Sequence, residues 1–247
     1  MFSTKLRLTI LAFIGIMMLT PSTNVFSQTF DNELDFLRSV SCSTFESFES
    51  LADRGHSNDP IVTAQFTITP QLAPAGIRST NTGGHFATEG SKYVDAGSGT
   101  TTTELVFELA SPATGFGLSV TDFGDSGTGD LTFQTDAGAL TEEFVVASTP
   151  QGSGGLIFFG FTQEIEFSTV TVRARTVNDG IGIDGVHIVP AAILGDVNMD
   201  GVVDFFDIQP FINVLSSQTF QAEADIDGNG VVNFFDISPF IQLLSSQ

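Results

Sequence analysis

A stretch of 24 residues near the C-terminal end of the chain occurs twice. Residues 195–218 and 224–247 are identical at 15 of 24 aligned positions. Each copy begins with a run of Asp and Asn residues interrupted by glycine, GDVNMDGVVDFFD in the first and ADIDGNGVVNFFD in the second. Close carboxylates repel one another, so this regular spacing indicates a cation between them. Similarity of this extent predicts that one small structural unit is present in duplicate.

The oxygen-bearing residues of both copies follow the spacing of an EF-hand calcium loop. In such a loop, Gly at position 6 allows a sharp turn, positions 1, 3, 5, 9 and 12 point inward, and position 7 offers its backbone carbonyl. Position 12 is Asp rather than Glu, so the backbone must bring this shorter side chain to the ion. The alternative is an acidic turn that binds no metal. The expected ligands of two calcium ions are Asp196, Asn198, Asp200, Val202, Asp204 and Asp207 in the first loop, and Asp225, Asp227, Asn229, Val231, Asn233 and Asp236 in the second.

Together with the short apolar segment after each loop, these motifs resemble type I dockerin modules. The resemblance covers about residues 195–247. It implies that each half is a calcium loop followed by one helix, and that the halves pack with pseudo-twofold symmetry. It also implies a partner, because dockerins attach secreted proteins, often polysaccharide-degrading enzymes, to cohesin modules. The sequence departs from the family at loop positions 10 and 11 and farther along each helix. Small hydroxyl residues are replaced by Phe205-Phe206 and Phe234-Phe235, and basic residues by Ile212-Asn213 and Ile241-Gln242.

The paired phenylalanines allow two interpretations. A module of about 53 residues buries little apolar surface, so metal binding and Phe packing are its usual sources of stability, and we expect the pairs to lie in its core. The alternative is a face that binds a partner. Pro210 and Pro239 lack an amide hydrogen and suit the first turn of a helix. They predict short helices over residues 210–217 and 239–246, with Gln209 and Ser238 just outside.

Residues 41–189 have the pattern of an all-β domain. Short stretches rich in Thr, Val and Phe, several of them alternating between apolar and polar residues, are separated by turn sequences such as SPATG and TPQGSGG. This pattern predicts a mainly β protein with an antiparallel, jelly-roll-like β-sandwich and no helix in that range. The apolar connector at 189–195 should hold the C-terminal module close to the sandwich. The expected strands are Thr103–Leu109, Gly115–Phe123, Asp130–Asp136, Glu143–Ser148, Gly155–Phe161, Ser168–Thr176 and Ile181–Ile188.

Two short motifs loosely resemble the first and last strands of jelly-roll, galactose-binding-like modules: TFESFESL at residues 44–51 and GIGIDGVHI at 180–188. Such modules often hold a structural calcium between carboxylates of the end strands. The resemblance implies a third calcium site formed by Glu46 or Glu49 with Asp184, although we expect Asp184 to be a solvent-facing turn residue. Carbohydrate is one candidate ligand of the sandwich. The chain has only Tyr93 and no Trp to stack on a sugar ring.

The N-terminal segment has the pattern of a signal peptide. Lys5 and Arg7 precede an apolar run, Leu8–Leu19, that is too short to span a bilayer. We expect a signal peptide over 1–27, a β-sandwich domain over 28–190 and a dockerin-like domain over 191–247. The protein would then be secreted, extracellular or at the cell surface, with no membrane span after removal of the signal. An N-terminal membrane anchor is the alternative.

The charge balance and the reactive residues exclude several classes of function. With 29 acidic and 8 basic residues, the net charge of −21 argues against binding of nucleic acid or anionic membranes. Cys42 is the only cysteine, so no intrachain disulfide forms, and we expect a buried thiol. The three histidines lie outside any HExxH motif and no GxSxG motif occurs. We therefore predict no catalytic residues.

These features predict a secreted, modular calcium-binding protein. Its dockerin-like module would mediate calcium-dependent docking onto a cohesin-like or other secreted or surface protein. Its sandwich would be a binding or structural module, with polysaccharide as a candidate ligand. The first alternative is a polysaccharide-degrading glycoside hydrolase that carries a dockerin tag. The second is a surface protein in which the C-terminal module only caps the sandwich.

Overall fold

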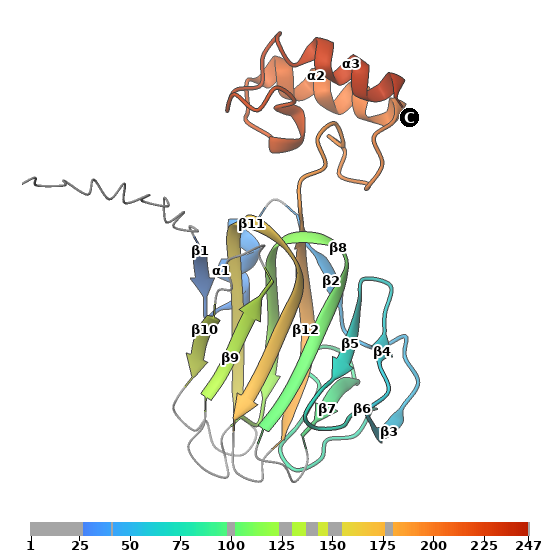
Figure 1. Ribbon diagram of the computed structural model, residues 1–247, viewed down its shortest axis with the longest axis vertical. Helices are drawn as coiled ribbons and strands as arrows, with labels where there is room; N and C mark the ends of the chain where they lie inside the picture. The colour runs from blue at the N-terminus through green and yellow to red at the C-terminus, as the bar shows by residue number, and fades with distance from the viewer. Residues whose placement is uncertain are drawn as a thin grey trace, which may run out of the picture.

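The computed structural model describes residues 27–40, 42–97, 102–123, 130–136, 143–147, 155–175 and 180–246. Apart from its last residue, the predicted signal peptide lies outside these ranges. Strands dominate the chain as far as Pro190, and short helices follow (Figure 1). Within the described ranges, none of the helices has the length and apolar character needed to cross a membrane.

Twelve strands form one hydrogen-bonded sheet in which the pairing is antiparallel, as the turn-rich sequence predicts. The main path of the sheet runs β10-β9-β11-β8-β12-β7-β6-β3. The strands are β1 (Ser27–Phe30), β2 (Thr44–Glu46), β3 (Arg54–Ser57), β4 (Ile61–Val62), β5 (Phe66–Pro70), β6 (Ala75–Arg78), β7 (Tyr93–Ala96), β8 (Thr102–Thr121), β9 (Asp130–Thr135), β10 (Glu143–Ala147), β11 (Leu156–Arg175) and β12 (Ile181–Pro190).

Strands β8 and β11 are 20 residues long and each runs through two layers of the sandwich. The first half of β8 pairs with β5 and the second half of β11, whereas its second half pairs with β12 and the first half of β11. The predicted turn SPATG (residues 111–115) is therefore wrong, because this segment carries β8 from one layer to the other without leaving the strand. The prediction divided β11 in the same way, into Gly155–Phe161 and Ser168–Thr176.

Phenylalanine contacts join the two layers of the sandwich. Phe107 and Phe116, from opposite halves of β8, have ring centroids 5.3 Å apart. Phe133 of β9 lies 4.8 Å from Phe159 of the first half of β11. The first pair is edge-to-face and the second is tilted, and such aromatic pairs add to the free energy gained by apolar burial. The high Phe content is thus used mainly in the core between the layers.

A short helix, α1 (Glu33–Ser39), was not predicted. Asn32 caps it, accepting a hydrogen bond from the Asp35 amide at 3.2 Å. The helix buries Phe36 completely, in a small cluster with Phe158 and Val189. One buried side chain in a seven-residue helix leaves too little apolar periodicity to detect in the sequence.

The C-terminal module contains two helices that lie side by side, α2 (Ile208–Ser217) and α3 (Ile237–Ser245). Two short 3-10 segments accompany them, η1 (Phe205–Asp207) and η2 (Ala222–Ala224). The rings of Phe211 and Phe240 stack at 4.2 Å between the helices. The helices begin two residues earlier than predicted, at Ile208 and Ile237, directly after the loop residues Asp207 and Asp236. The prolines still lie in the first turn, where an amide hydrogen has no helical partner.

Candidate functional site

The first Asp-rich loop closes on the carboxylate at its twelfth position. Asp207 accepts the amide of Asn198 at 2.9 Å on one oxygen and the amide of Asp204 at 2.8 Å on the other. At the other end of the loop, Asp196 accepts the amide of Gly201 at 2.8 Å. These hydrogen bonds bring the first and last acidic side chains of the loop to its interior. Asp207 is fully buried.

The second loop repeats this pattern position by position. Asp236 accepts the amide of Asp227 at 3.1 Å and that of Asn233 at 2.8 Å, and Asp225 accepts the amide of Gly230 at 2.8 Å. Carboxylate oxygens of Asp225, Asp227 and Asp236 lie within 4.8 Å of one another. Among the described residues, this is the only group of three metal-ligating acidic, His or Cys side chains at such distances. In the first loop, an amide side chain replaces the second of these carboxylates.

The donor set of both loops suits a hard divalent cation. Four of the aspartates are buried, yet residues 191–247 contain eight acidic residues and no Lys, Arg or His to neutralise them. Buried carboxylates without a counter-charge are costly, whereas Ca²⁺ takes six to eight oxygen ligands of this kind. The residues present therefore fit calcium in both loops. The buried four are Asp196, Asp207, Asp225 and Asp236.

The paired phenylalanines at positions 10 and 11 of the loops are exposed, which corrects the expectation that they pack in the core. Phe205 and Phe206 are 79% and 75% exposed, and Phe234 and Phe235 are 80% and 76% exposed. The module instead builds its core from valines inside the loops, an alanine just before the second loop and one Phe on each helix. That core consists of Val197, Phe211, Ala224, Val232 and Phe240, with partly buried neighbours.

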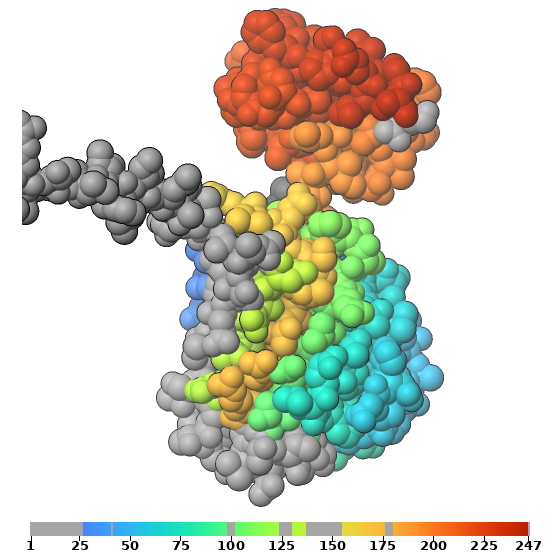
Figure 2. All heavy atoms as spheres, in the orientation of Figure 1, coloured from blue at the N-terminus to red at the C-terminus, as the bar shows by residue number. Residues whose placement is uncertain are grey.

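The comparison with known families agrees with this architecture. Residues 194–245 match the model of the dockerin type I domain. The C-terminal module is dockerin-like. In the space-filling view the dockerin-like module stands at one end of the sandwich (Figure 2). A search of characterised proteins finds none with significant similarity to this chain.

Solved structures resemble the sandwich only distantly. A cleaved adhesin domain of Lys-gingipain has a TM-score of 0.39 and 17% identity, covering 61% of this chain and 99% of its own. TmCBM61, solved with β-1,4-galactotriose, has a TM-score of 0.38 and 14% identity, covering 52% and 90%. The CBM22-1-GH10 modules of the Clostridium thermocellum xylanase Xyn10B have a TM-score of 0.31 and 11% identity, covering 60% and 31%.

Of the three carboxylates expected to form a third calcium site in the sandwich, Asp184 and Glu49 hold the loop around residues 88–91 through hydrogen bonds. Asp184 accepts the backbone amides of Thr88 and Glu89 at 2.7 and 2.8 Å. Glu49 accepts the amide of Ser91 at 2.7 Å. Glu46 accepts the amide of the nearby Phe48 at 2.6 Å. None of the three belongs to a metal-ligating group in the described part of the chain.

Asp184 is fully buried, so the expectation of a solvent-facing turn residue is wrong. Burial raises the pKa of Asp184 to about 6, against the lowering effect of the amides that it accepts. Glu49 lies at the surface, and hydrogen bonds from the backbone amides of Ser91 and Lys92 hold its pKa below the usual value. Two carboxylates that hold the same loop thus have pKa values shifted in opposite directions.

Two histidines converge on a buried carboxylate that the sequence did not single out. His85 Nδ1 lies 2.7 Å from Asp95 Oδ1, while its Nε2 faces Asp122 Oδ2 at 3.3 Å. His56 Nε2 and Arg78 Nε approach the second oxygen of Asp95 at 2.9 and 3.0 Å. Burial by itself raises the pKa of Asp95, but the hydrogen bond from His85 and the neighbouring positive charges hold it below the ordinary value. No linear spacing signals this cluster, since separate strands and loops supply its members.

Cys42 is half-buried rather than fully buried as expected. It lines a cavity of about 210 Å³ between the sandwich and the dockerin-like module. Met199 and Asp200 of the first loop line the same cavity. The apolar connector approaches β8, since the amide of Ala191 donates to the Pro112 carbonyl at 2.9 Å. The first Asp-rich loop therefore faces the sandwich, in keeping with the short connector.

Proposed function

We propose that this protein is secreted and docks, in a calcium-dependent manner, onto a cohesin-like or other secreted or surface protein through its dockerin-like module. Each Asp-rich loop binds one calcium ion. The side chains at positions 1, 3, 5, 9 and 12 and the carbonyls of Val202 and Val231 are the ligands. The observation that carries this proposal is the exposure of a Phe pair within each loop, at positions 10 and 11.

The backbone of each Phe pair is hydrogen-bonded to a proposed calcium ligand of its loop. Phe206 donates its amide to Asp204 Oδ1 at 2.8 Å, and Phe235 donates its amide to Asn233 Oδ1 at 2.8 Å. Each of these acceptors is the proposed ligand at position 9. Calcium bound there orients the backbone that carries the two rings. Exposed clusters of large apolar side chains on a small domain support an interaction surface.

A capture experiment with the full chain tests the docking proposal. The chain is immobilised with calcium or with chelator, and purified secreted and surface proteins of the source organism are passed over it. We expect one defined partner, retained with calcium and released by chelator. Replacing both Phe pairs by Ser should abolish retention, whereas Phe220→Ser should not, because Phe220 is 62% exposed but lies outside the loops. Equal retention by the four-Phe variant would refute docking through these residues.

The sandwich is proposed as the binding module of the protein, with carbohydrate as its ligand. It carries no calcium-loop motif, and the charge of the whole chain favours neutral ligands over anionic ones. Binding to soluble polysaccharides, measured by affinity electrophoresis, tests this role. Release of reducing sugar from the same polysaccharides would instead favour the glycoside hydrolase alternative.

A further inference from the structure

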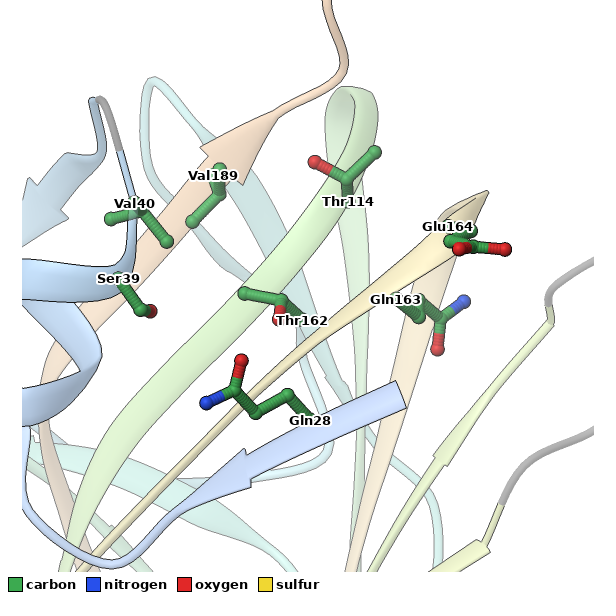
Figure 3. A pocket seen from close by; sticks show the side chains of 8 residues that line it. All are labelled: Gln28, Ser39, Val40, Thr114, Thr162, Gln163, Glu164 and Val189. Atoms are coloured by element: carbon green, nitrogen blue, oxygen red, sulfur yellow. The ribbon is translucent and has the colours of Figure 1, made fainter. Parts of the chain in front are cut away.

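A hollow of about 310 Å³ opens on the sandwich beside the N-terminal segment (Figure 3). Its walls come from β1, from the C-terminal end of α1, from β8 and β11 where these strands bend, and from β12. None of its lining residues belongs to the calcium loops or to the Phe pairs. The side chains used below are Gln28, Thr114, Thr162, Gln163, Glu164 and Val189.

A break in strand register creates this hollow. Thr162 of β11 pairs with Gly115 of β8, but the next paired residues are Phe167 and Ala113. Four residues of β11 thus lie opposite the single residue Thr114. A bulge of this kind bends the strand, turns side chains to new directions, and is over-represented beside binding sites.

The bulge is held in place by its own contacts. Gln163 is 5% exposed, and its Nε2 donates to the Ile165 carbonyl at 2.7 Å. On the other side, Gln28 of β1 is the cross-strand neighbour of Thr162. The hollow is therefore built from paired strands and a fixed bulge, and its side chains are positioned before any ligand arrives.

The walls offer hydrogen-bonding groups that are not already engaged. The side chains of Gln28, Thr114, Thr162 and Glu164 make no hydrogen bond to other described residues, and Figure 3 shows them around the opening. Hydroxyl and amide groups both donate and accept, and the Glu164 carboxylate accepts. The buried Val189 adds an apolar contact. This mixture matches a ligand with several hydroxyl groups on an apolar ring.

The charges of the residues that line the hollow indicate which classes of ligand it can bind. Among the described residues that line it, Glu164 is the only charged one and none is basic. Together with the net charge of −21, this disfavours phosphates, carboxylates and uronic acids. A single exposed carboxylate also supplies too few ligands for a divalent cation. An uncharged polyhydroxylated ligand remains.

We propose that this hollow is a binding subsite for a sugar unit of a neutral glycan. Thr114, Thr162, Gln28 and Glu164 hydrogen-bond its hydroxyl groups, and Val189 contacts its ring. A volume of about 310 Å³ is at the lower end for ligand pockets, which suits a short saccharide segment rather than a long chain. This inference rests on the binding role proposed for the sandwich and is independent of docking by the C-terminal module.

Affinity electrophoresis of the full chain with calcium tests this subsite. The probes are galactan, glucan, mannan and xylan, with polygalacturonate as an anionic comparison. The double variant Thr114→Val, Thr162→Val keeps the side-chain shape but removes both hydroxyls, and Glu164→Gln removes the charge. Their matched controls are Thr169→Val, half-buried on the same strand, and Glu166→Gln, exposed two residues along, neither of which lines the hollow.

We expect at least one neutral polysaccharide to retard the wild-type chain and polygalacturonate not to do so. The double variant should bind about tenfold more weakly, because it loses two hydrogen bonds to the ligand. The control variants should bind as tightly as the wild type. All variants should have the melting temperature of the wild type. Unchanged binding by the double variant and by Glu164→Gln would overturn the subsite but leave the binding role of the sandwich. Absence of binding to every neutral probe would overturn both, and preference for polygalacturonate would overturn the ligand class.

Discussion

At the scale of single residues, the aspartate at position 12 of each loop has two tasks. Asp236 accepts two backbone amides, which closes the loop, and it is also the proposed clamp on the ion. An Asn side chain has nearly the same shape but only one acceptor oxygen and no charge. The substitution therefore keeps the size of the side chain but removes its charge and one of its two amide acceptors.

We expect Asp236→Asn to lower the calcium affinity of the second loop by about tenfold or more, since calcium affinity depends on ligand charge. Calorimetric titration should then resolve one tight site and one weak site. Asn233→Ser is a milder control, because it retains a neutral oxygen at position 9. Two unchanged sites in Asp236→Asn would mean that this carboxylate does not bind the ion.

The two carboxylates that hold the loop around Thr88 should have pKa values shifted in opposite directions from those of free side chains. With a pKa of about 6 in the folded chain against 3.8 when unfolded, Asp184 keeps its proton between pH 4 and 6 only in the folded state. Its contribution to the free energy of unfolding, about 3 kcal/mol, is therefore present below pH 4 and lost as the pH rises to 6. Side-chain carbon NMR should place the Asp184 midpoint near pH 6 and that of Glu49 below its usual value. A midpoint near pH 4 for Asp184 would contradict this.

At the scale of elements, the packing of α1 depends on glycine in the neighbouring strand. A Cβ atom on Gly160 would lie 2.8 Å from the ring of Phe36, the one residue by which α1 is buried. Glu33 of the same helix also reaches His187 of β12, at 2.7 Å. The helix is thus attached to the sandwich at one apolar and one polar point.

Gly160→Ala should displace the Phe36 ring and destabilise the sandwich by about 1–3 kcal/mol, the usual cost of overpacking. Urea unfolding measures the loss, and faster proteolysis near α1 locates it. Gly55→Ala is the matched control, since a Cβ atom there meets nothing within 4 Å. A Gly160→Ala variant as stable as this control would show that Phe36 accommodates the methyl group.

At the scale of the whole molecule, the two modules differ in the source of their stability. The sandwich has a large apolar core, whereas the dockerin-like module buries six apolar residues and carries eight acidic residues without a basic one. Metal binding supplies folding free energy where the unfolded chain lacks a formed site.

Removal of calcium should therefore unfold the dockerin-like module and leave the sandwich folded. Calorimetry should give two thermal transitions with calcium and one with chelator, and far-ultraviolet circular dichroism should lose its helical part. The sandwich transition serves as the internal reference. A helical signal that survives chelation would show that the apolar core alone folds the module.

The duplicated loops and the β class were readable from the sequence because their determinants are local. Loop ligands such as Asp196 and Asp207 lie within twelve residues, and strand alternation repeats every two residues. The first turn of each C-terminal helix was also marked locally, by Pro210 and Pro239. In each case the residues that indicate the structure in the sequence are the same few residues that form it.

Only the tertiary structure decided the features that depend on distant segments. The core of the module is filled by Phe211, Phe240 and their neighbours, so the Phe pairs remain at the surface. The passage of β8 and β11 between layers follows from their pairing with each other, which overrides the turn preference of SPATG. The hollow beside Thr114 arises from a register break between those two strands. Composition and spacing do not indicate which surfaces pack together. Burial and strand register therefore depend on the tertiary structure.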